Sequence, residues 1–285
     1  MKNTLPYLIN LPPFIYRGKD IEKFNLFQKF IFLIYGKFIS LIVSWTNKSL
    51  FCFLINTFVK DSNLSYSDNK YVTEFNNQKV YFPNKRILRF INGAAISVEK
   101  TFKAYCLDQI DFKDDDIFID CGANVGEVNI ALKFNNINVK YIGFEPDTET
   151  YECLRLNNEE GDFYRMALSN TNEEKDFFLD SAGGNSSLVN FGTEDSIKVE
   201  SKTLDSLKFS NIKVLKIDAE GFEPEVLEGS IESLKITEFV SVDFGHERGV
   251  EQESTIIEVN NLLYEHGFGL YKFSDVRLVG LYKRK

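Results

Sequence analysis

Two short segments, about 20 residues apart, carry residue types that together could bind a nucleotide cofactor. The first is the glycine-rich run Gly122-Ala-Asn-Val-Gly126, and glycine lets a backbone turn sharply and come close to a ligand. The second segment ends in Glu145, which Pro146 follows. A carboxylate at this distance can accept hydrogen bonds from two ribose hydroxyls. The pair therefore predicts a site for a cofactor that contains adenosine.

The hydropathy pattern indicates which elements position these residues. Apolar runs at 117–121 and 141–145 are typical of buried strands, and an apolar helical spacing begins after the first run. Ligands of open α/β sheets bind at the carboxyl ends of strands, and a helix N-terminus there favours a carboxylate or phosphate. We expect Asp120 to anchor the turn or to reach the cofactor's amino group through water. The tail of the cofactor is expected to contact Gly122, Ala123, Asn124 and Gly126.

The loop also discriminates between cofactors. A dinucleotide site usually has the pattern G-x-G-x-x-G, which leaves the pyrophosphate on bare backbone. Asn124 stands where the second glycine is expected, so a pyrophosphate fits less well than the amino-acid tail of S-adenosylmethionine. Two alternatives remain open on the same fold. One is an NAD-dependent oxidoreductase, and the other is a non-catalytic nucleotide-binding module.

Two motifs resemble a known family. Ile119-Asp-Cys-Gly-Ala-Asn-Val-Gly126 resembles motif I of the class I methyltransferases, and Leu215-Lys-Ile-Asp-Ala-Glu-Gly-Phe-Glu223 resembles the K-I-D-x-E-G-x-E signature of the FkbM family. The similarity extends from about residue 80 to the end of the chain. It implies an S-adenosylmethionine-dependent O-methyltransferase that acts on a sugar, a glycan or a glycosylated metabolite. It also implies that the segment Met166-Ala-Leu-Ser169, which contains Ala167, passes the adenine ring.

Methyl transfer to a hydroxyl requires alignment of the acceptor oxygen with the methyl group, and it benefits from a nearby base. The candidate residues are Asp218, Glu220, Asp243 and His246. In one interpretation, Asp218 or His246 takes the proton directly. In the other, Asp218 and Asp243, joined by Glu220, hold a Mg²⁺ that acidifies a sugar diol. A structural alternative exists for Glu220 and Glu223, because acidic residues also bind the N–H groups at a helix N-terminus.

The alternation of strand and helix patterns predicts an α/β, Rossmann-like class I methyltransferase fold. We expect a seven-stranded, mostly parallel sheet with one antiparallel strand. Its strands are predicted at 117–121, 141–145, 162–165, 214–218, 239–244, 268–273 and 276–282, and its main helices at 99–111, 126–134, 146–158, 224–234 and 251–266. Short strands at 175–180 and 197–201 flank a Gly/Ser-rich loop, 181–187, which is either a mobile substrate cover or a plain surface loop.

The first 65 residues differ from the rest because residues 24–59 are dense in Phe, Ile and Leu. Lys29, Lys37 and Lys48 interrupt this stretch, and a membrane span needs about 20 apolar residues. It also lacks the layout of a signal peptide. We therefore predict an N-terminal helical segment, 1–65, and a methyltransferase domain, 66–285. The helices either pack on the domain or on a second subunit in a homodimer, which we favour, or lie on a membrane surface with lysines toward the headgroups.

Composition limits the partners. The formal net charge of −9 argues against nucleic acid as a ligand, because phosphate binding needs an excess of Lys and Arg. The four cysteines form no C-x-x-C pair and there are only two histidines, so a zinc site is not expected. A reducing cytoplasm is the expected location, with the alternative of peripheral attachment to a membrane.

Overall fold

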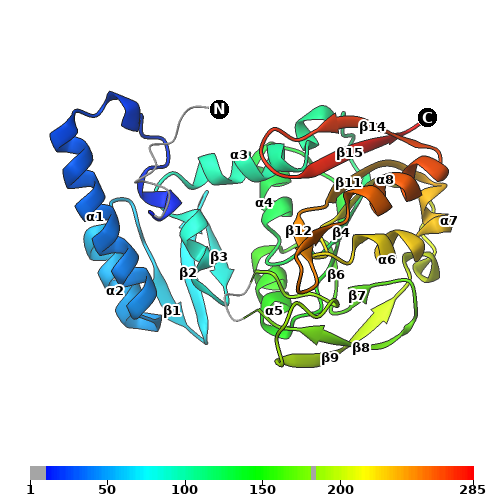
Figure 1. Ribbon diagram of the computed structural model, residues 1–285, viewed down its shortest axis with the longest axis horizontal. Coiled ribbons are helices and arrows are strands. Elements are labelled where there is room, and N and C mark those ends of the chain that lie inside the picture. Colours follow the sequence, from blue (N-terminus) through cyan, green and yellow to red (C-terminus); the bar gives the residue numbers. More distant parts are fainter. Residues whose placement is uncertain (1–10, 181–183) are drawn as a thin grey trace. The chain divides into compact units, whose positions relative to one another are not determined.

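The computed structural model describes residues 11–180 and 184–285. The chain divides into two compact units, Met1–Ser97 and Val98–Lys285. Figure 1 shows the elements of both units, and each unit is described here by itself. The N-terminal unit extends beyond residue 65 because the hairpin that follows the helices packs against them. Within this unit the ring of Tyr71 lies 5.5 Å from that of Phe51, edge to face.

The C-terminal unit is built on a seven-stranded sheet with the order β14-β15-β11-β10-β4-β5-β6. Strands β6, β5, β4, β10 and β11 run parallel to one another, and β15 is antiparallel to both of its neighbours. The predicted fold class, a mostly parallel sheet with one antiparallel strand, is therefore confirmed. The strands are β4 (Ile117–Cys121), β5 (Lys140–Phe144), β6 (Asp162–Tyr164), β10 (Ile212–Ile217), β11 (Thr237–Asp243), β14 (Phe268–Phe273) and β15 (Val279–Arg284).

The sequences of the central strands are mostly apolar because both faces of the sheet are covered there. Side chains such as Ile119, Leu215 and Val240 are completely buried in one large core cluster. The helices of this unit are α3 (Ala94–Ala104, which begins in the N-terminal unit), α4 (Glu127–Phe134), α5 (Thr148–Asn157), α6 (Glu223–Glu228), α7 (Ile231–Leu234) and α8 (Ile256–Glu265). Short 3₁₀ helices are η5 (Leu107–Gln109) and η6 (Leu204–Leu207).

Three predicted helices differ from those observed. The helix expected at 99–111 ends at Ala104, because Cys106 takes a left-handed conformation with φ of 55°. The helix expected at 224–234 is split into α6 and α7 at Gly229, where an added Cβ would lie 1.9 Å from the carbonyl oxygen of Ser169. The helix expected from residue 251 begins at Ile256. Residues before it form the hairpin β12 (His246–Arg248) and β13 (Glu253–Ser254).

A second, three-stranded sheet has the order β7-β9-β8, with β7 (Ala167–Leu168), β8 (Glu173–Phe178) and β9 (Ser196–Lys202). Strands β8 and β9 are antiparallel and correspond to the two short strands that were predicted around the Gly/Ser-rich loop. Residues 181–183 of that loop lie outside the described residues. Its interpretation as a substrate cover therefore stays a prediction.

The N-terminal unit contains α1 (Leu26–Trp45), α2 (Lys48–Phe58) and a small antiparallel sheet. Helix α1 begins at a capping box, in which Asn25 and Gln28 each bind the other's backbone N–H. The remaining elements are η2 (Pro13–Ile15), η3 (Ile21–Lys23), β1 (Ser65–Ser67), β2 (Lys70–Phe75), β3 (Gln78–Phe82) and η4 (Lys85–Phe90). Strands β2 and β3 form an antiparallel hairpin.

Helix α1 is long and apolar enough to cross a membrane, judged by its length of 20 residues and its composition. From the sequence, the apolar stretch was predicted to be too short for a membrane span, because Lys29 and Lys37 interrupt it. In the structure both lysines fall inside one uninterrupted helix. The core helix of a soluble protein passes the same test of length and composition, so this property alone does not decide where the helix lies.

Candidate functional site: a cofactor cradle beside an acidic cluster

The loop after β4 is fixed by the ends of two neighbouring strands. The N–H groups of Gly122 and Ala123 both donate to the carbonyl oxygen of Phe144, at 3.1 and 3.0 Å. Gly122 has φ of +74°, and a Cβ added there would lie 1.9 Å from the carbonyl oxygen of Asp218. Only glycine can therefore bring the loop this close to the end of β10. Gly126 is similar, since an added Cβ would lie 2.1 Å from Nδ2 of Asn158.

Glu145 lies directly after β5 and is buried. Its Oε2 accepts from the N–H of Asn124 and its Oε1 from the N–H of Asp147, both at 3.0 Å. Burial raises the pKa of Glu145 to about 7, although these backbone donors favour the ionised form. Each carboxylate oxygen can accept more than one hydrogen bond. The group is therefore held in place with capacity left for ligand hydroxyls. We call residues 122–126 together with Glu145 the cofactor cradle.

A buried ion pair supports the cradle from inside the sheet. Nζ of Lys216 lies 2.8 Å from Oδ1 of Asp120, and it also donates to the carbonyl oxygen of Gly122 at 2.8 Å. The hydroxyl of Tyr141 donates to Oδ2 of Asp120. Asp120 is fully buried, so of its two expected roles the geometry favours anchoring the turn.

Sequence reasoning overlooked Lys216, although its signal was present. A lysine between apolar residues in the middle of a buried strand, as Lys216 is between Leu215 and Ile217, must find a partner. Asp120 sits directly opposite Lys216 in the parallel register of β4 and β10. Burial opposes the charged form of the lysine, but Asp120 and Asp218 outweigh it and raise the pKa of Lys216.

The ends of β10 and β11 bring Asp218 and Asp243 to the same region, as expected, but Arg277 lies between them. Nη2 of Arg277 is 2.5 Å from Oδ2 of Asp243, and its Nη1 is 3.7 Å from Oδ2 of Asp218. The hydroxyl of Tyr105 donates to Oδ2 of Asp218. Burial raises the pKa of Asp243 to about 8, and the charge of Asp218 adds to this effect. Tyr105 and Arg277 were not anticipated, because both are distant from the motifs in sequence.

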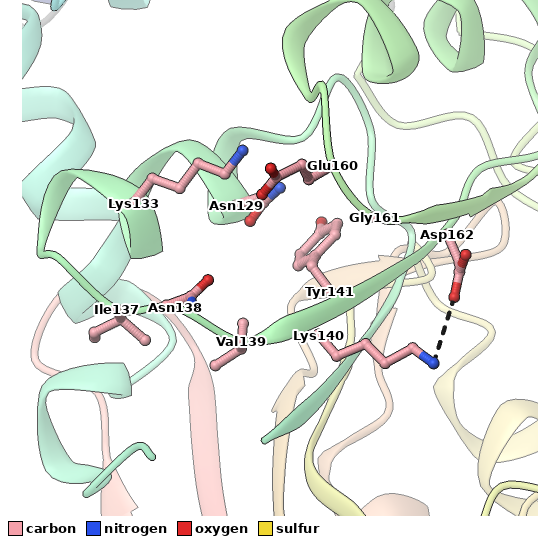
Figure 2. A pocket seen from close by; sticks show the side chains of 10 residues that line it. All are labelled: Asn129, Lys133, Ile137, Asn138, Val139, Lys140, Tyr141, Glu160, Gly161 and Asp162. Atoms are coloured by element: carbon pink, nitrogen blue, oxygen red, sulfur yellow. Dashed lines mark ion pairs between the residues drawn. The ribbon is translucent and has the colours of Figure 1, made fainter. Parts of the chain in front are cut away.

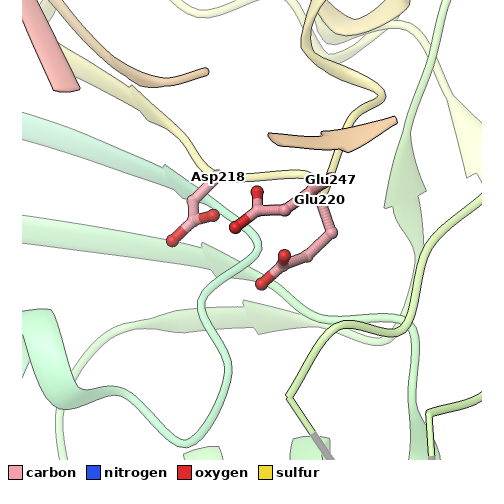
Figure 3. Close-up of side chains that lie close together, drawn as sticks. All are labelled: Asp218, Glu220 and Glu247. Carbon is pink, nitrogen blue, oxygen red and sulfur yellow. The ribbon is translucent and has the colours of Figure 1, made fainter. Parts of the chain in front are cut away.

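Three carboxylates form what we call the acidic cluster: Asp218, Glu220 and Glu247 (Figure 3). Each offers an oxygen atom within 4.8 Å of the others. The carboxyl groups of Glu220 and Glu247 lie close enough that a proton on one of them would allow a hydrogen bond between them. Burial raises the pKa of Glu220 to about 10, and the nearby charges of Asp218 and Glu247 contribute. Burial and mutual repulsion therefore both favour a proton on the Glu220–Glu247 pair.

The acidic cluster differs from the set predicted from sequence. Glu247 was overlooked, and its neighbour His246 was chosen instead. In the structure His246 is exposed, whereas Glu247 is partly buried and joins Asp218 and Glu220. The signal that could have identified Glu247 is alternation along β12, in which successive side chains point to opposite sides. Because His246 and Glu247 are neighbours on this strand, only one of them can face the acidic cluster.

A second layer of contacts fixes the loop that carries Asp218 and Glu220. Oε1 of Glu223 accepts from the N–H groups of Ala219 and Gly221, at 3.1 and 2.9 Å. Its Oε2 accepts from the hydroxyl of Thr255 at 2.8 Å. These contacts of the carboxylate are all with protein groups, two in the loop and one in the residue before α8. Glu223 fits the structural interpretation, while Glu220 turns toward the acidic cluster.

The two other predicted cofactor residues lie on neighbouring elements. Pro146 is buried directly after Glu145, ahead of α5. Ala167 is buried in β7, where it pairs with Ser201 of β9. Asp147 caps α5 by accepting from the N–H of Thr150, so Pro146 serves as a link between the cradle and the helix.

A cavity of about 160 Å³ lies elsewhere in this unit, among the side chains that Figure 2 shows. Two of its lining residues, Lys140 and Asp162, are the first residues of β5 and β6. Nζ of Lys140 lies 3.9 Å from Oδ2 of Asp162. The cavity is therefore at the amino ends of the strands. The cofactor cradle is at the carboxyl ends, where ligands of such sheets bind. This cavity is also smaller than the roughly 300–1,000 Å³ typical of ligand pockets.

The donor set of the cradle fits S-adenosylmethionine. The glycines leave the backbone of the loop bare, and Glu145 is preoriented by two backbone donors for ribose hydroxyls. The carboxylates of the acidic cluster lie around the end of β10, against which the loop packs, and negative charge there favours a sulfonium. No second glycine is available for a pyrophosphate, because Asn124 occupies that position with φ of 50°.

The topology and this site define a class I, Rossmann-like methyltransferase. A model of the methyltransferase FkbM domain matches residues 120–270, which is more than half of the chain. The chain therefore belongs to the FkbM methyltransferase family. Among curated proteins, no sequence matched this chain.

Solved structures with similar architecture are distant in sequence. An FkbM methyltransferase from Methylobacillus flagellatus is 16% identical with a TM-score of 0.44, over 69% of this chain and 52% of that one. The chain thus spans about half the length of that protein. A TYW2 from M. jannaschii, solved with AdoMet, is 11% identical with a TM-score of 0.39, over 77% of this chain and 88% of that one. A SAM-dependent methyltransferase from Aquifex aeolicus is 13% identical with a TM-score of 0.38, over 65% and 92%.

Proposed function

We propose that the chain is an O-methyltransferase that transfers the methyl group to a hydroxyl of a sugar, a glycan or a glycosylated metabolite. The observation that carries this proposal is the acidic cluster at the end of β10, next to the cofactor cradle. Asp218, Glu220 and Glu247 offer a proton acceptor and several hydrogen-bond acceptors in one place. A hydroxyl needs such a base, and a polyol also needs acceptors for its other hydroxyls.

The residues that would hold the donor are those of the cradle. The backbone of Gly122, Ala123, Asn124 and Gly126 lies along the amino-acid tail, and Glu145 accepts from the ribose hydroxyls. The family resemblance implies that Ala167 lies near the adenine, and Pro146 is proposed as a further cofactor contact. When bound, S-adenosylmethionine supplies a methyl group carried on a positively charged sulfur. The nearby carboxylate of Asp218 favours that charge.

The Glu220–Glu247 pair is the proposed base. Because the two carboxyls share one proton, the pair carries one negative charge and can accept a second proton. Burial raises the pKa of Glu247 as well, which makes its carboxylate a better base at neutral pH. Asp218, held by Tyr105, orients the acceptor hydroxyl. Asp243 is paired with Arg277, which leaves it a supporting role.

The Mg²⁺ alternative makes a different prediction. A divalent ion shared by Asp218 and Asp243 would meet Arg277, which already lies between them. The place that suits an ion better is the acidic cluster itself, where carboxylate oxygens gather. In our proposal that place is occupied by a shared proton. Methyl transfer should therefore persist in a chelator such as EDTA.

We also infer a reducing, cytoplasmic setting for the enzyme. Its four cysteines are all buried, and none of them takes part in a disulfide. Burial raises the pKa of the Cys121 thiol and of the Cys52 and Cys106 thiols, which keeps them unreactive. These properties support a protein that folds without disulfides.

Transfer of labelled methyl groups from S-adenosylmethionine to a panel of acceptors tests the function. The panel should contain monosaccharides, oligosaccharides, glycolipids, a peptide and a tRNA, each with and without EDTA. We expect label on a sugar-bearing acceptor, in a base-stable ether linkage, with and without the chelator. Label on the peptide or the tRNA alone would contradict the glycan acceptor. Loss of sugar labelling in EDTA, with recovery in Mg²⁺, would contradict the proton-transfer route.

A further inference from the structure

Charge is divided unequally between the two units. Residues 1–97 contain 13 Lys or Arg and 5 Asp or Glu, which is a formal net charge of +8. Residues 98–285 contain 20 Lys or Arg and 37 Asp or Glu, which is −17. The overall charge of −9 therefore hides a basic N-terminal unit. A basic unit of this size is attracted to a negatively charged surface.

The N-terminal unit also exposes large apolar side chains along one face of α1. Trp45 is 83% exposed and Phe27 is 72% exposed. The ring of Phe38 lies 4.9 Å from that of Phe58 in α2, so the exposed faces of the two helices meet. We call this set the apolar face: Leu26, Phe27, Phe30, Ile31, Ile34, Phe38, Leu41 and Trp45 of α1 with Leu50, Phe53 and Phe58 of α2.

The opposite side of α1 is packed within the unit. Phe32, Gly36, Ile39 and Ile42 are buried there. A Cβ added at Gly36 would lie 2.6 Å from Cδ1 of Leu11, so the segment before the helix lies directly on it. A helix that crosses a bilayer as a lone span would lose these contacts. The packing therefore favours a helix that lies in the membrane interface and keeps its other side on the protein.

A cavity of about 470 Å³ in the same unit is lined by three arginines, Arg17, Arg86 and Arg89. Pro13, Val43 and Leu88 are among its apolar lining, and none of its described lining residues is acidic. Helix α1 contributes Val43 and two serines to this cavity, so the cavity and the apolar face share one helix. Desolvation and the charge of Arg89 lower the pKa of Arg17. An anion between the arginines would relieve this repulsion.

We propose that the N-terminal unit is a peripheral membrane-binding module for bilayers that contain anionic phospholipids. The apolar face enters the acyl boundary, and a lipid phosphate occupies the arginine-lined cavity. A bilayer with anionic lipids offers both an apolar layer and negative charge, which match the apolar face and the net charge of +8. The acidic C-terminal unit of a second copy of this chain could attract the basic unit. Its carboxylates, however, would not cover an apolar face of this length. This inference does not depend on the acceptor of the methyl group.

The single tryptophan gives a direct measurement, because Trp45 lies on the apolar face. The full chain is titrated with vesicles of phosphatidylcholine, alone or mixed with phosphatidylglycerol, while Trp45 emission and co-sedimentation are followed. We expect a blue shift and sedimentation with the anionic vesicles, reduced by salt. Carbonate should release the protein. Failure to bind anionic vesicles would overturn the proposal, and carbonate-resistant insertion would overturn the interfacial placement.

Two sets of variants separate the components of binding. Phe27→Ser/Phe30→Ser should abolish sedimentation, whereas Ile257→Ser, an equally exposed apolar change in α8, should not. Arg86→Gln/Arg89→Gln should lower affinity for anionic vesicles roughly tenfold or more, whereas exposed Lys79→Gln should change it little. Circular dichroism checks folding of each variant. A different result would identify a second copy of the chain as the partner. In that case the native chain would not bind vesicles, and Phe27→Ser/Phe30→Ser would dissociate a dimer observed without vesicles.

Inorganic phosphate distinguishes the source of the anion. Phosphate and chloride are compared at the same ionic strength, and phosphate should weaken vesicle binding more than chloride does. Without vesicles, phosphate should not shift the emission of Trp45. Equal effects of the two salts would contradict a phosphate site in the cavity. The same comparison with the Arg86→Gln/Arg89→Gln variant is the control, because it should no longer distinguish the salts.

Discussion

The cofactor cradle and the acidic cluster meet at the end of β10, but their charges are balanced in different ways. In the cradle, Glu145 has two backbone donors and Asp120 has Lys216, so the negative groups are matched before any ligand arrives. In the acidic cluster, three carboxylates face one another, and a shared proton relieves part of the repulsion. The difference indicates that the cradle is built to hold one rigid ligand, whereas the cluster is built to change its protonation.

The largest effect is expected at Gly122. Gly122→Ala places a Cβ 1.9 Å from a backbone oxygen of Asp218, so the cradle must move away from β10. We expect loss of S-adenosylmethionine binding and a decrease of roughly 3 kcal/mol or more in the free energy of unfolding. Calorimetric titration and urea denaturation measure these.

Gly267→Ala is the matched control for that change. Gly267 has a similar φ of +84°, but an added Cβ would have nothing within 4 Å. Its cost should be limited to backbone strain, about 1 kcal/mol, with binding unchanged. Equal losses in the two variants would show that φ, and not the approach to β10, makes Gly122 necessary.

Lys216→Met should be the next most damaging change. It leaves Asp120 buried without its cation, and removing one partner of a buried pair costs about 3–5 kcal/mol. Lys213 of the same strand pairs with exposed Glu238, so Lys213→Met should cost only about 0–1 kcal/mol. Thermal and urea unfolding of both variants measures this contrast. A small loss in Lys216→Met would mean that Asp120 is satisfied without the lysine.

Glu247→Gln tests the acidic cluster without a change of shape. The amide can still hydrogen-bond to Glu220 but cannot accept the proton, so kcat should fall about 10²–10⁴-fold. Affinity for S-adenosylmethionine should stay within about twofold, because the cradle is untouched. His246→Gln, at the neighbouring exposed position, should keep both values near those of the native chain. A reversed result would support the direct role that the sequence suggested for His246.

The pH dependence of cofactor binding should sharpen the contrast further. The pKa of Glu145 is about 7, raised above its value in the unfolded chain. Its protonated form is therefore favoured by folding. This contribution to stability is complete below the unfolded pKa and is lost as the pH rises through about 7. Ribose binding needs the opposite, ionised form.

Affinity for S-adenosylmethionine should therefore decrease as the pH falls through 7, by roughly tenfold per unit below it. Glu145→Gln should bind weakly and without this pH dependence. Because Glu223 has a pKa of about 7 as well, a pH profile that survives in Glu145→Gln would assign the titration to Glu223 instead. Calorimetry across this range, in buffers of matched ionic strength, provides the measurement.

The sequence predicted the local parts of the site better than its long-range contacts. Apolar runs that end in Asp120, Glu145 and Asp218 identify strands, and parallel strands place their ends at one edge. Gly122 and Gly126 mark the turn because only glycine fits there. The alternation of strands and helices also predicted the mostly parallel sheet with one antiparallel strand, whereas the order of the strands came from the structure.

The acidic cluster could not be derived in this way. Tyr105 and Arg277 reach Asp218 from segments more than 50 residues away in sequence, as their separations of 113 and 59 show. Whether Glu247 or His246 faces inward depends on the register of β12, a short strand in a segment for which the sequence predicted neither strand nor helix. The break at Gly229 was missed because it depends on the approach of Ser169, which no local pattern encodes.

The central claim is that the cradle binds S-adenosylmethionine through Glu145. Calorimetric titration of the chain and of Glu145→Ala with S-adenosylmethionine, S-adenosylhomocysteine and NAD tests it most directly. We predict binding of both sulfur compounds, no binding of NAD, and loss of affinity in the variant. Glu238→Ala, which changes an exposed acidic residue near the amino end of β11, should retain the affinity. Binding of NAD alone, or equal affinity of the native chain and Glu145→Ala for S-adenosylmethionine, would contradict the account.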